Sequence, residues 1–166
     1  MTRIVSFPPV CGPRARTLIL GTMPGEASLR IREYYGHPRN QFWQIIGSIA
    51  GFDYRIPYEE RLKALVREHL ALWDVVAECR REGSLDSAIK DEQPNGIRDF
   101  LAERPLIKKI LFNGGPAQRL FRRHFNDILC SEDYCSVVMP STSPACARYT
   151  FEEKLERWRR ALLPLP

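Results

Sequence analysis

The chain has 166 residues, of which 44% are hydrophobic and 27% charged, as in an ordinary globular protein, and this length suits a single domain over residues 1–166. No apolar run approaches the roughly 20 residues of a membrane span, and the N-terminus lacks the apolar core of a signal peptide, so we expect a cytoplasmic protein. The net charge is +5, and 20 of the 25 basic residues are arginine, whose planar guanidinium pairs well with phosphate, so a nucleic-acid partner and a merely solvated basic surface are both open.

Short apolar runs alternate with amphipathic segments along the chain. The runs predict strands at residues 17–20, 71–76, 109–112 and 136–139. The amphipathic segments predict helices at residues 41–50, 58–69, 97–102, 117–125 and 151–162, with Asn95 as a cap of the third. Residues 80–96, rich in charge and turn formers, predict a long mobile loop. The pattern indicates a three-layer α/β/α domain with a central four-stranded, mainly parallel sheet.

The residues after each predicted strand carry the unusual chemistry. Turn-forming or polar residues follow all four runs, at residues 21–25, 74–78, 113–115 and 139–144. Ligands of open α/β sheets bind beyond the carboxyl ends of the strands. We therefore expect these four loops to form one pocket.

Residues 18–43 read LILGTMPGEASLRIREYYGHPRNQFW and are the most informative stretch. The first apolar run stops at a GTMPG turn, as a buried strand does at the edge of a sheet. Two tyrosines then precede His37-Pro38-Arg39-Asn40 and an apolar helix signal. Flat aromatic faces with imidazole and amide groups would suit a pocket that grips a planar heterocycle.

This stretch resembles the uracil-DNA glycosylase superfamily, whose mismatch-specific branch carries a GxNPG turn followed by an HPxNxFW segment. The MPSTSPACAR loop is similar to the second motif of that superfamily. Met23 stands where the mismatch-specific branch has its catalytic Asn, but the GTMPG turn, the YYxHPRNxFW run and the STSPA loop resemble the hypoxanthine-DNA (deoxyinosine) glycosylases. The resemblance implies a monofunctional DNA glycosylase that flips out and removes deaminated bases, hypoxanthine and possibly uracil, to initiate base excision repair.

The resemblance also implies roles for individual residues. Asn40 of HPRN takes the catalytic part, with Asp74 near the position where uracil-specific relatives read the base edge with an Asn; Asp74 could equally be a helix cap. The expected substrate-binding residues are Gly21, Thr22, Met23, Pro24, Gly25, Tyr35, His37 and Asn113. The expected DNA-binding residues are Arg39, Ser141, Thr142, Ser143, Pro144, Ala145 and Arg148, with hydroxyls on phosphate and Pro144 and Ala145 wedged into the base stack.

Other functions stay open at the level of sequence. They are a mismatch-type uracil-DNA glycosylase, a catalytically weak relative that only binds damaged DNA, and a hydrolase of free nucleosides. The five cysteines contain no CxxC pair, so we expect no metal and no cofactor. The resemblance implies that the partner is DNA that contains deaminated bases, bound by a monomer, and that the protein acts at the nucleoid if it is prokaryotic.

Overall fold

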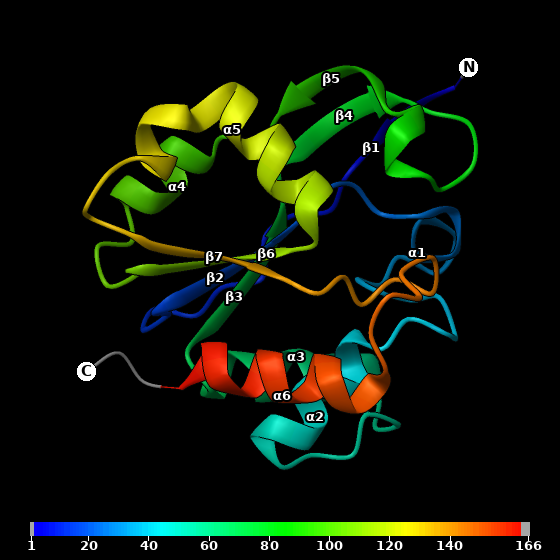
Figure 1. The fold of residues 1–166 in the computed structure, drawn as a ribbon, viewed down its shortest axis with the longest axis vertical. Coiled ribbons are helices and arrows are strands. Elements are labelled where there is room, and N and C mark those ends of the chain that lie inside the picture. The colour runs from blue at the N-terminus through cyan, green and yellow to red at the C-terminus, as the bar shows by residue number, and fades with distance from the viewer. Residues whose placement is uncertain (1, 164–166) are drawn as a thin grey trace.

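The computed structural model describes residues 2–163, so the ends of the expected domain, Met1 and residues 164–166, lie outside the described part. A parallel sheet of order β3-β2-β6-β7 lies between two helical layers (Figure 1). Its strands are β2 (Thr17–Gly21), β3 (Leu70–Asp74), β6 (Lys109–Asn113) and β7 (Cys135–Met139). The predicted three-layer architecture and four parallel strands are confirmed.

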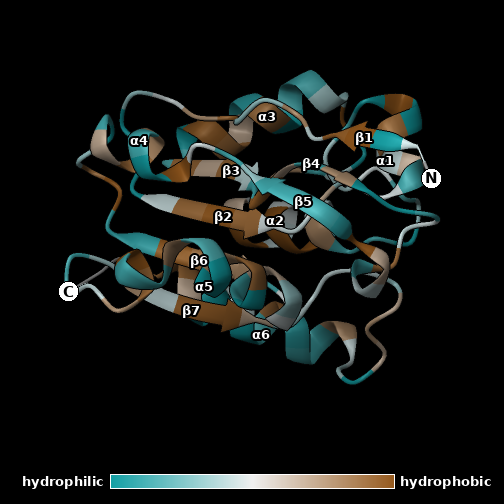
Figure 2. Ribbon diagram, turned by 90° about the horizontal axis from the view of Figure 1, so that it is seen from above, coloured by the Kyte–Doolittle hydropathy of each residue, from teal (hydrophilic) through white to brown (hydrophobic). Residues whose placement is uncertain are grey.

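Both faces of the parallel sheet are buried because successive side chains point to opposite sides and nearly all are apolar. Leu18 and Leu20 belong to one core cluster and Ile19 to the other. In Figure 2, β2, β6 and β7 are correspondingly coloured as hydrophobic. One face is covered by α2 (Phe42–Ala50), α3 (Tyr58–Arg67) and α6 (Phe151–Leu162), and the other by α4 (Ile97–Ala102) and α5 (Gly115–Leu129). No helix in residues 2–163 is long and apolar enough to cross a membrane.

A second, antiparallel sheet of order β1-β4-β5 was not predicted. It consists of β1 (Arg3–Val5), β4 (Val76–Arg80) and β5 (Lys90–Pro94). The predicted strand at 71–76 is wrong at its end, because the chain leaves the parallel sheet after Asp74. The predicted loop at 80–96 is also wrong, because it contains the 3-10 helix η1 (Asp86–Ala88) and β5. The sequence of β5, KDEQP, has no apolar alternation, so only its pairing with β4 makes it a strand (Figure 2).

Two further differences lie beside the carboxyl edge of the sheet. Helix α1 (Glu26–Ile31) starts directly after the GTMPG turn and was not predicted. Asn95 does not cap α4, whose N-cap is Gly96. Its amide Nδ2 instead donates to the carbonyl oxygen of Asp74 (2.8 Å) and to Oγ of Ser6 (3.3 Å). Asn95 therefore stabilises the end of β3, where the chain turns from one sheet into the other.

Candidate active site

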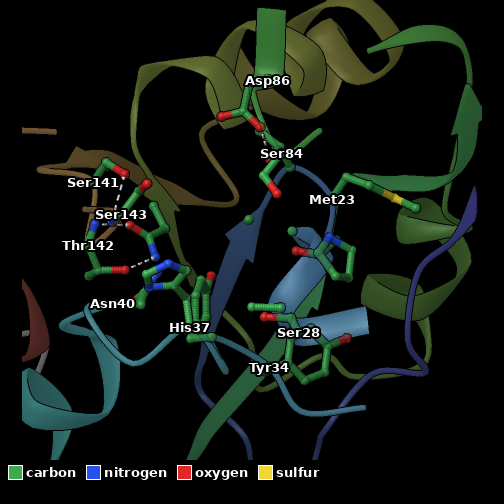
Figure 3. Close-up of a pocket in the computed structure, with 18 of the residues that line it drawn as sticks. Met23, Ser28, Tyr34, His37, Asn40, Ser84, Asp86, Ser141, Thr142 and Ser143 are labelled. Carbon is green, nitrogen blue, oxygen red and sulfur yellow. Dashed lines mark hydrogen bonds between the residues drawn. The ribbon is translucent and has the colours of Figure 1, made fainter. Parts of the chain in front are cut away.

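A cavity of about 160 Å³ opens at the carboxyl edge of the parallel sheet (Figure 3). All four predicted loops contribute to its lining. The predicted residues that line it are Gly21, Thr22, Met23, Pro24, Gly25, Tyr35, His37, Asn40, Asp74, Asn113, Ser141, Thr142, Ser143 and Pro144. The lining residues that sequence reasoning missed are Ala27, Ser28, Tyr34, Ser84 and Asp86. Arg39, Ala145 and Arg148 are not part of the lining.

Gly21, the last residue of β2, lies where no side chain fits. A Cβ at this position would be 2.5 Å from Oδ1 of Asp74 and 3.0 Å from Oη of Tyr35. The absence of a side chain therefore lets a carboxyl group and a phenol approach the same point at the floor of the cavity.

Asp74 is a buried carboxyl group at the end of β3, with 3% of its surface exposed. Its Oδ2 atom is buried and has no hydrogen-bond partner among residues 2–163. Burial, together with the nearby charge of Asp86, raises the pKa of Asp74 to about 7, although Arg81 opposes this shift. No backbone N–H of the described residues donates to its carboxylate, so capping does not explain the residue. Asp74 can hold a proton close to neutral pH.

Asp86 belongs to η1 and reaches the cavity from the segment that was predicted as a loop. Thr22 donates from Oγ1 to Oδ1 of Asp86 (2.6 Å). Burial raises the pKa of Asp86, against the effect of this hydrogen bond and of Arg81. Arg81 is itself buried and donates from Nη2 to the carbonyl oxygen of Pro24 (2.5 Å). No local sequence signal marks Asp86, because its position depends on contacts across more than 60 residues.

Asn40 and His37 lie on the opposite wall, in the turn before α2 (Figure 3). The side-chain oxygen Oδ1 of Asn40 accepts the backbone N–H of Phe42 (3.0 Å), which orients the amide and leaves Nδ2 unpartnered among the described residues. Nδ1 of His37 accepts the backbone N–H of Arg39 (3.0 Å), so a neutral His37 carries its hydrogen on Nε2. Both side chains thus offer N–H donors at the cavity.

Tyr35 is held in a left-handed backbone conformation, with φ +54°, which an aromatic residue adopts at an energetic cost. Its ring stacks on that of Phe42, with 4.1 Å between the ring centroids. Its hydroxyl is buried without a partner among the described residues, and burial raises its pKa. The neighbouring Tyr34 is fixed by Trp43, whose Nε1 donates to the Tyr34 carbonyl oxygen (2.8 Å). Packing of this aromatic cluster offsets the backbone strain.

Asn113 and Thr142 bind each other across the ends of β6 and β7. Nδ2 of Asn113 donates to Oγ1 of Thr142 (2.9 Å), and the backbone N–H of Thr142 donates to Oδ1 of Asn113 (3.0 Å). Thr142 is fully buried, and its hydroxyl accepts this bond and positions the loop; its contact with phosphate stays a prediction. Gly114, with φ +98°, allows this approach, since a Cβ there would lie 3.1 Å from that of Ser141.

Comparisons with known proteins agree with this geometry. The family described as the uracil DNA glycosylase superfamily matches residues 8–163. The chain belongs to the uracil DNA glycosylase superfamily. It is 38% identical over 156 residues to a protein of Methanosarcina barkeri named hypoxanthine DNA glycosylase, covering 93% of this chain and 95% of the relative.

A second relative of the same name, from Methanosarcina acetivorans, is 35% identical over 151 residues, covering 90% of this chain and 92% of the relative. A solution NMR structure from Methanosarcina acetivorans, provisionally assigned as a uracil DNA glycosylase, is also similar. It superimposes with a TM-score of 0.80 at 32% identity, over 96% of this chain and 99% of that one.

Met23 is the residue at which this glycosylase-superfamily member departs from the mismatch-specific pattern. Only 6% of Met23 is exposed, and its side chain joins the hydrophobic core on the side of α4 and α5. In Figure 3 its thioether points away from His37 and Asn40. A buried thioether cannot orient water, so Met23 contributes packing and the backbone of the GTMPG turn.

The outer rim carries the remaining residues expected to bind DNA. Arg39, Pro144, Ala145 and Arg148 are exposed. Neither Arg39 nor Arg148 forms an ion pair with another residue in the range 2–163. The guanidinium of Arg148 lies 5.3 Å from the centre of the Tyr149 ring, and that of Arg157 lies 4.4 Å from it. This end of the superfamily member therefore places free positive charge around a cavity that contains carboxyl groups.

Proposed function

We propose that the protein is a monofunctional DNA-deoxyinosine glycosylase that removes hypoxanthine from DNA and initiates base excision repair as a monomer. The observation that carries this proposal is the charge arrangement of the site. No Lys or Arg of the described residues lines the cavity, whereas two carboxyl groups do, and free arginines lie outside it. Such a cavity favours a neutral base and leaves the phosphates on the rim. The two Methanosarcina relatives named hypoxanthine DNA glycosylase support the choice of base.

The proposed reaction begins when the nucleotide leaves the stack and its base enters the cavity beside Tyr35. Asn40 holds a water molecule in line with C1′, opposite the departing base. Protonated Asp74 donates to a ring nitrogen of the purine. As the C1′–N9 bond breaks through an oxocarbenium-like state, its electron pair and the Asp74 proton go to the base. The oxygen of the water bonds to C1′, and the proton that it loses passes to solvent.

Alkali treatment after incubation with duplexes containing deoxyinosine, deoxyuridine or deoxyxanthosine tests this proposal. We expect strand breaks at deoxyinosine that require alkali, because a monofunctional enzyme leaves an intact backbone at the abasic site. Breaks at deoxyuridine alone would instead indicate a mismatch-type uracil glycosylase. Tight binding without abasic sites would indicate a damage-binding relative, and hydrolysis of free inosine would indicate a nucleoside hydrolase.

Tyr35 is expected to stack on the flipped base with the part of its ring that Phe42 leaves free. Because base–aromatic stacking contributes about 1–3 kcal/mol, Tyr35→Ala should slow excision roughly tenfold or more. Tyr35→Phe should remain near wild type, since the lost hydroxyl has no partner among the described residues. Single-turnover excision rates measure both effects. A Phe variant as slow as the Ala variant would assign the role to the hydroxyl, near Asp74.

Arg39 and Arg148 are expected to contact phosphate. Replacing either with Ala should weaken binding to duplex DNA and reduce the salt dependence of binding by about one counterion. Binding constants measured over a range of salt concentrations test this. Arg14→Ala is a suitable control, because Arg14 is also exposed but precedes β2, at the opposite edge of the sheet. If the slope of the logarithm of the binding constant against the logarithm of the salt concentration is unchanged in both variants, Arg39 and Arg148 are solvated and do not contact phosphate.

A further inference from the structure

Leu85 is an exposed apolar residue at the mouth of the cavity. Its exposed fraction is 62%, one of the highest among the large hydrophobic residues of the described chain. Its two sequence neighbours, Ser84 and Asp86, both line the cavity. Single exposed leucines are common on protein surfaces, so the position of Leu85 between two cavity-lining residues is what distinguishes it.

The segment that carries Leu85 is anchored to the GTMPG turn. The backbone N–H of Glu26 donates to Oγ of Ser84 (2.9 Å), and Thr22 donates to Asp86 (2.6 Å). Arg81 donates from the base of the segment to the carbonyl oxygen of Pro24 (2.5 Å). These three contacts lie on both sides of Leu85. The side chain is therefore exposed on a fixed backbone rather than on a free loop.

Leu85 also shares a groove with the loop that the superfamily resemblance assigns to DNA binding. This groove lies next to the cavity, and Leu85, Ala145, Arg148, Tyr149 and Arg157 are among the residues that line it. Four residues line both the groove and the cavity: Ser84, Asp86, Ser141 and Ser143. Figure 3 shows Ser84 and Asp86 on one side of the site and Ser141 and Ser143 on another. Apolar surface beside free guanidinium groups suits a strand of DNA, whose bases are apolar on their faces and whose phosphates are anionic.

We infer that Leu85 inserts into the base stack of duplex DNA beside the flipped nucleotide. This inference rests on the proposed glycosylase function and adds a second wedge to the one expected at Pro144 and Ala145. Ala145 presents only a methyl group, whereas leucine can fill more of the gap that a departing base leaves. Wedging by apolar side chains is a general way to keep a base step open. Leu85 is thus a positioning residue that favours the extrahelical state of the base.

A comparison of duplex and single-stranded substrates tests the role of Leu85. Single-turnover excision of hypoxanthine is measured for the wild type, Leu85→Ala and Leu85→Met, on one oligonucleotide with and without its complement. We expect Leu85→Ala to be roughly ten- to a hundredfold slower on the duplex, in line with losing the burial of one leucine, and near wild type on the single strand. Leu85→Met should retain most of the duplex activity. Leu106→Ala is the matched control, since Leu106 is 51% exposed on the turn before β6, at the far edge of the sheet.

A binding measurement separates this inference from the proposed chemistry. A 2-aminopurine next to the deoxyinosine becomes fluorescent when its stacking is disturbed. We expect the wild type to raise this fluorescence in a duplex, and Leu85→Ala to raise it less. Fluorescence that depends on Leu85 without any excision would support the wedge and overturn the glycosylase proposal. Equal loss of activity on both substrates, no loss on the duplex, or fluorescence that is independent of Leu85 would overturn the wedge.

Discussion

Replacing Asn40 with Asp is expected to preserve the melting temperature and abolish most base excision. The side-chain oxygen of Asn40 accepts the N–H of Phe42 at the start of α2 (3.0 Å), and an aspartate oxygen can accept the same bond. The substitution replaces the free Nδ2 donor with a charged oxygen, which changes the contacts with both water and base. Asn40→Ala should lose activity and also about 1 kcal/mol of stability, because the hydrogen bond to Phe42 is lost.

Thr150→Ala provides a control for the stabilising role alone. Thr150 caps α6 through a reciprocal pair of hydrogen bonds with Glu153, far along the chain from Asn40. This variant should lose a similar amount of stability, by thermal or urea unfolding, while its excision rate stays near wild type. If Asn40→Asp excised hypoxanthine at the wild-type rate, Asn40 would only stabilise the turn before α2 through its hydrogen bond with Phe42. Asp74 would then be the remaining candidate for positioning water.

The parallel sheet and its rim could be predicted because their physical causes are local. In β6, Ile110 and Phe112 point to one face of the sheet and Leu111 to the other, so the strand is apolar on both faces, as a doubly covered sheet requires. Because the strands are parallel, the turn residues after each run lie together at the carboxyl edge of the sheet. By contrast, β5 is polar throughout and exists because β4 pairs with it, so no local pattern indicates it.

The protonation and burial of the polar groups in the site could not be predicted, because they too depend on contacts between residues that are distant in the sequence. The pKa of Asp74 depends on burial beneath the cavity and on Asp86, which η1 brings close from 12 residues further along the chain. The burial of Thr142 likewise depends on Asn113, 29 residues away in sequence. A serine- and threonine-rich loop indicates hydroxyl groups, but its sequence does not show which hydroxyl faces outward.

Asp74 is expected to couple stability, activity and pH in one residue. Its pKa in the folded protein, about 7, lies above the ordinary carboxyl value of 3.8. Between these two pH values the folded state binds more protons than the unfolded state, so the free energy of unfolding should fall as the pH rises through this range. Asp74→Asn removes this titration. The variant should therefore melt at a higher temperature than the wild type at pH 8, with little difference at pH 4.

The same substitution should slow excision. An amide can donate a hydrogen bond to the purine but cannot transfer a proton, and general acid catalysis contributes about 10²–10⁴-fold. We expect Asp74→Asn to be at least a hundredfold slower at pH 6. The wild-type rate should fall as the pH rises through about 7, where Asp74 ionises, while the rate of the variant should change little over the same range.

The combination of higher stability and lower activity identifies a buried charge kept for function. If Asp74 had only a structural role, its replacement would lower both the stability and the excision rate. Asp127→Asn is the matched control: Asp127 is exposed and paired with Arg98 (2.6 Å), which lowers its pKa, so its removal should neither raise the melting temperature nor alter excision. Melting curves and single-turnover rates from pH 5 to pH 8 decide the case. A stabilised Asp74→Asn variant with wild-type activity would show that Asp74 does not protonate the departing base. The role of Asp74 would then be limited to contact with the base edge.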